Sequence, residues 1–331
     1  MNTSHIALPA PARYFPFAKG RYEIKTGLYT LDTDFGNGML DRNRFQLDRQ
    51  FHEYRARKHS ARERDLAQHM CLAEQTPALR HANAFILQTL VREYPQYFRL
   101  GQTPDRTTLH CELSGEDIHM DRDLQLLQEE GPRSARYANT LDALACQIQE
   151  DLALVEVDAQ GNDQIVALHL CFPNHWTATD KIGKSFQGAH APVPHMEKIY
   201  QGAKSLLASL VQKGPYVRFA WGISRDRELH HPARPEQPIA FDPGHPQLYL
   251  RIERQFLQPL ENAGAFLFGI RTYFENIEEL REIPAHRQAL HAAIASMDAQ
   301  VLRYKGLEHD RDAILAWLAP RITRNGFDQV L

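Results

Sequence analysis

The chain has no apolar run approaching the roughly 18 residues that a membrane-spanning helix needs. Its first residues also lack a basic stretch followed by an apolar one, which a secretion signal would have. We therefore expect a cytoplasmic protein without a membrane-spanning segment. Net charge is small too, since 38 Lys and Arg against 41 Asp and Glu give −3 over 331 residues. Nothing in this ordinary globular composition points to nucleic acid as a partner.

Cysteine is scarce, and its spacing excludes several kinds of site. No two of the cysteines show the C-x-x-C or C-x-x-x-x-C spacing of clustered metal ligands. This argues against an iron–sulfur cluster or zinc knuckle built by local spacing, and against a disulfide framework. The four cysteines are Cys71, Cys111, Cys146 and Cys171.

Nucleotide-binding and hydrolase signatures are absent as well. Gly36-Asn37-Gly38 lacks the third glycine of a dinucleotide fingerprint, and there is no P-loop, G-x-S-x-G or H-E-x-x-H. The chain therefore offers no obvious site for its own reductant. Histidine, by contrast, is frequent: 17 of these residues favour metal or haem ligation without locating it.

The N-terminal part favours helices joined by irregular segments. Residues 1–33, rich in proline and aromatics, predict an extended arm on the surface. Helical periodicity covers residues 41–68, 77–93 and 138–150. Residues 101–136 show little periodicity and predict an irregular loop that can cover a site.

The first of these helices is rich in arginine. A solvated helix is the simpler interpretation. A docking face for an acidic partner protein over residues 42–64 stays open, because complementary charge accelerates encounter.

After residue 150 the period changes from 3.6 to 2. Two strands, a long polar segment with a helix, three more strands and a helical C-terminal part follow. This order is that of a PAS-like five-stranded antiparallel sheet with a helical crossover, elaborated by N- and C-terminal helices: an α+β fold with a pocket between sheet and crossover. A generic α+β sandwich without a pocket is the alternative. The predicted strands are 152–157, 165–172, 216–223, 248–254 and 265–273, with helices over 195–213 and 277–319.

These elements divide the chain into three parts, which we expect to form one compact unit. Residues 1–140 form an N-terminal arm and helical elaboration. Residues 141–275 form the PAS-like core, and residues 276–331 the C-terminal helices.

The polar segment from Cys171 to His195 is the most unusual in the chain. It follows a buried strand and combines three histidines with Trp176, Lys181 and Lys184. Neutral imidazole is the commonest protein ligand for haem iron, and nearby cations would meet the propionates. Capping or surface histidines are the simpler alternative.

The later strands carry polar residues that a purely structural sheet would not need. Alternation puts Trp221 on one face of its strand and Arg218 on the other. On the following strands, Glu253, Arg271 and Tyr273 fall on the less apolar face. They form either a cross-strand network on a solvated face or the far wall of a pocket that holds an amine.

At these residues the sequence resembles the alpha subunit of the haem-dependent oxidative N-demethylase family. Most of the resemblance lies between Asp142 and Tyr273, and shorter matches occur at residues 16–22 and 304–307. The stretches that carry it are 144–155, the 171–194 segment with Lys-Ile-Gly-Lys and His-Ala-Pro-Val-Pro, 250–255 and 270–273.

The resemblance implies a PAS-like domain that holds haem b. There, O2 and a small methylated amine such as dimethylamine would yield the shorter amine and formaldehyde. It further implies electrons from NADPH through a separate reductase carrying FMN and a [2Fe–2S] cluster, with tetrahydrofolate taking up the formaldehyde on a partner subunit. Ala220 stands where relatives usually carry asparagine before the tryptophan, which leaves the amine substrate open.

The resemblance also implies site residues. In haem-binding PAS domains the iron ligand comes from the crossover. Here it contains His175 directly after a strand, His195 beyond the Pro192-Val-Pro194 stop, and His190 between them. His190 is thus the expected ligand, and a histidine that only fixes the proline turn is the alternative.

The other expected residues surround the ligand. Trp176, Lys181 and Lys184 are expected near the haem, and Trp221, Glu253, Arg271 and Tyr273 near the amine. Two other functions stay open: a haem-PAS gas sensor without turnover, and a haem-free scaffold subunit.

Overall fold

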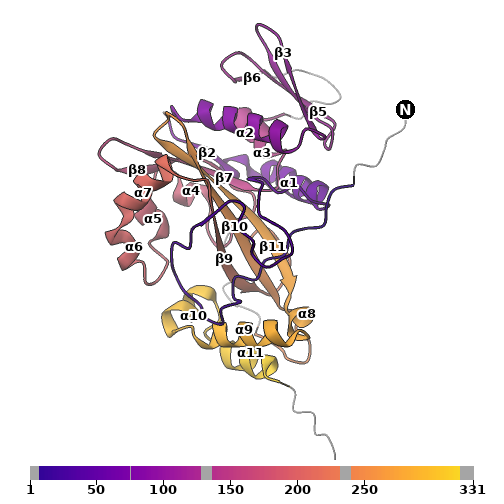
Figure 1. Cartoon of the computed structure of the whole chain (residues 1–331), viewed down its shortest axis with the longest axis vertical. Coiled ribbons are helices and arrows are strands. Elements are labelled where there is room, and N and C mark those ends of the chain that lie inside the picture. Colours follow the sequence, from indigo (N-terminus) through magenta and orange to yellow (C-terminus); the bar gives the residue numbers. More distant parts are fainter. Residues whose placement is uncertain (1–6, 75, 128–135, 232–239, 321–331) are drawn as a thin grey trace, which may run out of the picture.

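The computed structural model describes residues 7–74, 76–127, 136–231 and 240–320, which form an α+β fold around one large sheet (Figure 1). Within these residues the sheet has seven strands in the order β1-β9-β10-β11-β7-β8-β2, and all neighbours are antiparallel. The strands are β1 (Tyr29–Thr30), β2 (Met70–Leu72), β7 (Asp151–Val157), β8 (Asp163–His169), β9 (Tyr216–Ser224), β10 (Tyr249–Leu260) and β11 (Ala265–Asn276).

The five predicted strands form the centre of this sheet, and short strands from the N-terminal part extend both edges. The connection from β8 to β9 carries four helices, which lie to the left of the sheet in Figure 1. Leu207 and Leu210 of this connection pack against Leu257 and Phe266 on one sheet face. The helices are α4 (Ala178–Lys181), α5 (Phe186–His190), α6 (Glu197–Gln201) and α7 (Ala203–Gln212).

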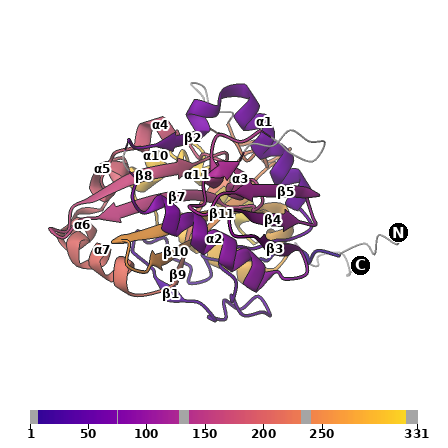
Figure 2. The ribbon, with the colours of Figure 1, turned by 90° about the horizontal axis from the view of Figure 1, so that it is seen from above.

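The opposite sheet face is covered by two groups of helices. At one end it packs against α2 (Leu79–Glu93) and α3 (Thr140–Ala145), and at the other against the C-terminal helices. Figure 2, seen from above, shows α2 and α3 on the near side and α4 to α7 at the left. The C-terminal helices are α8 (Ile277–Arg281), α9 (Pro284–Ala295), α10 (Ala299–Lys305) and α11 (Arg311–Leu318).

The prediction of an irregular loop over residues 101–136 was wrong. Up to residue 127 this region contributes to a second, four-stranded sheet, and residues 128–135 lie outside the described part. Two of its short strands have one buried and one polar face, which gives a period of two residues. The buried positions are Leu109, Cys111, Ile118 and Met120. The strands are β3 (Phe98–Gln102), β4 (Thr107–Cys111), β5 (Glu116–Met120) and β6 (Leu126–Leu127).

Two predicted helices are shorter than expected. Helix α1 (Phe51–His69) begins ten residues late, because Asp41 and Asp48 reach buried arginines of the sheet instead of continuing a helix. Helix α3 ends at Ala145, where the chain turns so that the side-chain oxygen Oε1 of Gln149 accepts a hydrogen bond from the backbone amide of Asp48.

The N-terminal arm was expected to lie on the surface, but part of it is buried. Tyr14 and Phe17 are buried among the C-terminal helices and the sheet. The arm therefore contributes to the core.

The proposed docking face on α1 has little free charge. Arg55 pairs with Glu116, and Arg57 pairs with Glu228. Arg62 is held by Asp142 inside the protein. These arginines therefore act mainly within the chain, which weakens the case for an acidic partner at this helix. Across the described residues, no helix combines the length and the apolar character needed to cross a membrane.

Gly269 is required by close packing within the sheet. It lies opposite Phe256, and an added Cβ would stand 2.0 Å from Cε1 of that ring. We expect Gly269→Ala to lower the free energy of unfolding by about 1–3 kcal/mol, the usual cost of overpacking. Gly101→Ala, whose Cβ would meet nothing closer than 3.9 Å, is the matched control in a urea titration. Equal stability of the two variants would contradict this expectation.

Candidate functional site

A cavity of about 1860 Å³ lies where the N-terminal arm, the crossover, one sheet face and the α10 region meet. Its volume exceeds the roughly 300–1,000 Å³ of pockets for drug-sized ligands. It can therefore take a large prosthetic group together with a small second ligand. Leu206, Leu207, Leu210, Leu257, Phe266 and Phe268 make one part of its wall apolar.

Strand register decides which polar side chains face this cavity. Glu253 pairs with Ala220 on one side and with Thr272 on the other, and Gln255 pairs with Arg218. Because paired residues share a sheet face, Arg218, Glu253 and Gln255 lie on the same face, and all three line the cavity.

Arg271 and Tyr273 lie on the other face, so the expectation that they share a wall with Glu253 was wrong. Arg271 donates to Asp48 at 2.8 Å, and its guanidinium lies 3.8 Å from the ring centroid of Tyr54. The Tyr273 hydroxyl bonds to Gln46. Both residues are buried in the core, and neither lines the cavity. Counting alternate residues within each strand could not show this, because only the register between strands relates their faces.

Trp221 shares the sheet face of Tyr273 and nevertheless reaches the cavity rim. It is paired with Ile252, which pairs with Tyr273. Its ring packs edge-on against Tyr22 of the arm, with centroids 5.3 Å apart, and both residues line the cavity. Trp221 therefore supports the arm at the rim.

Glu253 is a carboxylate on the cavity wall with few partners. Its Oε2 accepts a hydrogen bond from Gln255 Nε2 at 2.9 Å, and its Oε1 lies 4.0 Å from Arg251 Nε. Arg251 itself donates to the carbonyl groups of Phe172 and Leu229. Glu253 thus keeps hydrogen-bonding capacity for a cationic ligand.

His190 ends helix α5 and lines the cavity. Its Nδ1 lies 2.8 Å from the carbonyl oxygen of Phe186. Because a carbonyl group only accepts, Nδ1 carries the proton, and the neutral ring presents its lone pair at Nε2. Burial lowers the pKa of His190, which favours this neutral form. A ring held in this way has the tautomer that a metal ligand requires.

The other two crossover histidines also line the cavity, but in different settings. His195 Nε2 is bonded to Asp298 Oδ2 at 2.7 Å, and its side chain is 45% exposed. His175 is exposed, has a positive φ of 66° and lies six residues beyond the end of β8.

Of the two lysines expected near the haem, only Lys181 lines the cavity. Lys181 lines the cavity, bonds to the carbonyl group of Ala189 and lies 5.9 Å from the ring centroid of Trp176, which also lines it. Burial lowers the pKa of Lys181, and the charge of Lys184 adds to this effect. Lys184 is exposed and is not part of the cavity lining.

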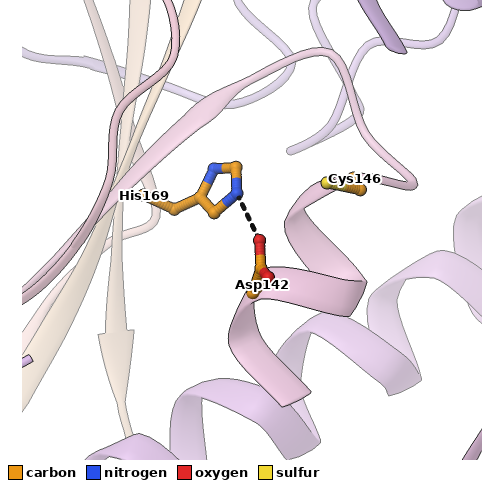
Figure 3. Close-up of side chains that lie close together, drawn as sticks. All are labelled: Asp142, Cys146 and His169. Carbon is orange, nitrogen blue, oxygen red and sulfur yellow. Dashed lines mark hydrogen bonds and ion pairs between the residues drawn. The ribbon is translucent and has the colours of Figure 1, made fainter. Parts of the chain in front are cut away.

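A second group of chemically capable side chains lies in the core, outside the cavity lining (Figure 3). Asp142, Cys146 and His169 offer ligand atoms within 4.8 Å of one another, and so do Asp151, His169 and Cys171. All are buried. The sequence did not indicate this cluster, because its members lie on separate elements that only the fold brings together.

Hydrogen bonds already satisfy the carboxylates of this cluster. Asp142 receives two bonds of 2.6 Å from Arg62 and one of 3.1 Å from His169, drawn as the dashed line in Figure 3. Asp151 receives the backbone amides of Cys171 and Phe172. Burial raises the pKa values of the thiols of Cys146 and Cys171, which keeps them protonated. We interpret the cluster as a structural polar network.

Comparison with known families gives a match over most of the chain. The model of a family described as haem-dependent oxidative N-demethylase, alpha subunit-like, matches residues 37–315. The matched range covers most of the chain. It includes the crossover and the sheet wall of the cavity, with His190 and Glu253.

Proposed function

The chain belongs to the haem-dependent oxidative N-demethylase, alpha subunit-like family, and from this premise we propose that it binds haem b in the large cavity and demethylates a small amine there. The family makes the chain a haem-dependent oxidoreductase. The observation that carries the proposal is the bond from His190 Nδ1 to the Phe186 carbonyl group, which leaves Nε2 free for iron.

The arrangement of the sheet supports a PAS-like haem domain. The central strands follow the order β9-β10-β11-β7-β8, and the long crossover between β8 and β9 supplies one cavity wall. That wall carries the proposed ligand His190. Apolar residues of α7, β10 and β11 line the same cavity, which suits the faces of a planar macrocycle.

When bound, the haem supplies the redox centre at which O2 is activated and the methyl group oxidised. The chain's own residues hold and orient the reactants. His190 would hold the iron. Lys181 and Trp176 line the same crossover wall, where the ammonium group of Lys181 would attract carboxylates of the haem. Glu253, which lies on the sheet wall, binds the ammonium group of the amine. The Gln255 amide fixes the orientation of the Glu253 carboxylate.

Partner subunits complete the proposed reaction. Electrons come from NADPH through a separate reductase with FMN and a [2Fe–2S] cluster, and tetrahydrofolate on a partner takes up formaldehyde. The family is that of an alpha subunit, which supports an assembly of several components. The cytoplasm is the proposed location.

Removing the charge of Glu253 tests its role. We expect Glu253→Gln to raise the KM for the amine about ten- to a hundredfold with a smaller change in kcat, because a charge-assisted bond contributes about 1.5–3 kcal/mol. Formaldehyde release measured against amine concentration gives both constants. Glu261→Gln, at an exposed position outside the cavity lining, is the control. An unchanged KM in Glu253→Gln would remove this carboxylate from the amine site.

Turnover itself is tested by formaldehyde release from dimethylamine and other methylated amines, with an artificial electron donor and O2. Release that requires both haem and O2 supports the proposal. Haem binding without release from any methylated amine would favour a gas sensor.

A further inference from the structure

Arg218 is a half-buried cation with few partners among the described residues. It lies on β9 with its side chain on the cavity wall. Its Nε is buried and has no hydrogen-bond partner within the part of the chain that the structure describes. Its Nη2 makes one long bond of 3.3 Å, to the carbonyl group of Lys25 in the arm.

A comparison with three buried arginines shows that Arg218 lacks a counter-ion. Arg62 is held by Asp142, Arg254 by Asp41 and Arg271 by Asp48. Arg218 has no ion pair within 4.0 Å among residues 7–74, 76–127, 136–231 and 240–320. Burying part of a guanidinium group without a counter-ion is unfavourable, so the protein gains from a ligand that supplies one.

Glu253 does not fill this role. It is paired with Ala220, whereas Arg218 is paired with Gln255, so the two charges are diagonal neighbours. The oxygens of Glu253 are directed to Gln255 and Arg251. Burial lowers the pKa of Arg218, and the charge of Glu253 only partly offsets this effect. The open side of Arg218 is the cavity.

We propose that Arg218 binds a carboxylate group of a ligand in the cavity. The planar fork of a guanidinium matches the two oxygens of a carboxylate, and the Lys25 carbonyl group restrains one arm of that fork. The identity of the ligand rests on the proposed function. Under that function the carboxylate has two sources. One is a haem propionate. The other is the substrate itself, as an N-methylated amino acid with its ammonium group at Glu253 and its carboxylate at Arg218.

Haem titrations of Arg218→Met and Arg218→Lys separate these sources. Arg21→Met is the control, since Arg21 also lines the cavity but its side chain is 74% exposed. With a propionate at Arg218, the Met variant binds haem b at least about tenfold more weakly, as expected for loss of a charge-assisted bond. Haem dimethyl ester, which lacks the charged carboxylates, then binds wild type and variant alike.

With a substrate carboxylate at Arg218, the variants keep the haem affinity of wild type. The absorption change caused by N,N-dimethylglycine then needs at least about tenfold more ligand in Arg218→Met, while the response to dimethylamine is unchanged. Unchanged affinity for haem b and for N,N-dimethylglycine in this variant would overturn the inference. If Arg218→Met does not fold, the same comparisons are made with Arg218→Lys, which keeps the charge and loses the fork.

Failure of the proposed function is distinguishable from failure of this inference. If the wild-type protein binds no haem, the proposed function falls. The carboxylate site is then tested by thermal unfolding of the haem-free protein with N,N-dimethylglycine. Stabilisation of wild type and of Arg21→Met, but not of Arg218→Met, would support the site, and no stabilisation of wild type would overturn it.

Discussion

Replacing His190 by alanine should abolish the histidine-ligated haem spectrum, and free imidazole should restore it. The reason is the fixed tautomer: Nδ1 donates to the Phe186 carbonyl group, so Nε2 is the atom that would bind iron. Loss of an outer-shell partner of a metal site costs about 10–100-fold in affinity or activity, and loss of the ligand itself should cost more. Absorption spectra and turnover of the haem-loaded variant measure both effects.

His175→Ala and His195→Ala serve as matched controls from the same crossover. His195 Nε2 is already bonded to Asp298, and His175 is exposed in the segment between β8 and α4. Both variants should keep the spectrum of wild type. A normal histidine-ligated spectrum in His190→Ala would transfer the role elsewhere, and His195 would be tested next.

The second large effect concerns the buried network of Figure 3. We expect Asp142→Asn to lower the free energy of unfolding by about 3–5 kcal/mol, because it leaves the charge of Arg62 buried without its carboxylate. Both side chains are enclosed, at 0% exposure for Asp142 and 8% for Arg62. Denaturant titration at neutral pH gives this value. A loss below about 1 kcal/mol, the range of surface ion pairs, would contradict the expectation.

Asp105→Asn is the control for this network. Asp105 pairs with Arg122 on the surface, where the two side chains are 82% and 72% exposed. Such a pair contributes at most about 1 kcal/mol, so the stability of this variant should stay close to that of wild type.

The same network gives stability a defined pH dependence. Burial opposes ionisation of Asp142, but hydrogen bonds from His169 and Arg62 prevail and lower its pKa well below the ordinary value of 3.8. The stabilisation is therefore complete above pH 3.8 and is lost as pH falls toward the lower folded pKa. Asp142→Asn should lack this acid-side loss. Parallel acid titrations of wild type and variant, followed by circular dichroism, show the difference.

Strands and amphipathic helices were predictable because their signals are local. Alternation of buried residues located the five central strands, and helix α2 ends at Glu93, just before Pro95. The second sheet was missed because its strands are short and alternate with polar residues such as His110 and Asp117. The late start of α1 depends on Asp41 and Asp48 reaching arginines more than 200 positions away, which no local pattern contains.

The site was predictable to the extent that it lies on one segment. The unusual composition of residues 171–195 pointed to a cavity wall, and the structure places His175, Lys181, His190 and His195 on it. Residues from separate strands were harder to place, because a one-residue difference in register moves a side chain to the other face. That is why Arg271 and Tyr273 were placed with Glu253, and why Arg218 was not recognised as a site residue.

A titration of the purified chain with ferric haem b, followed by absorption, decides whether the cavity is a haem site. The arrangement of His190 and the apolar wall predicts a saturable Soret band at one haem per chain, with the features of histidine ligation. It also predicts a spectral shift when a methylated amine is added. No Soret band at stoichiometric haem would contradict both haem binding and the demethylase function.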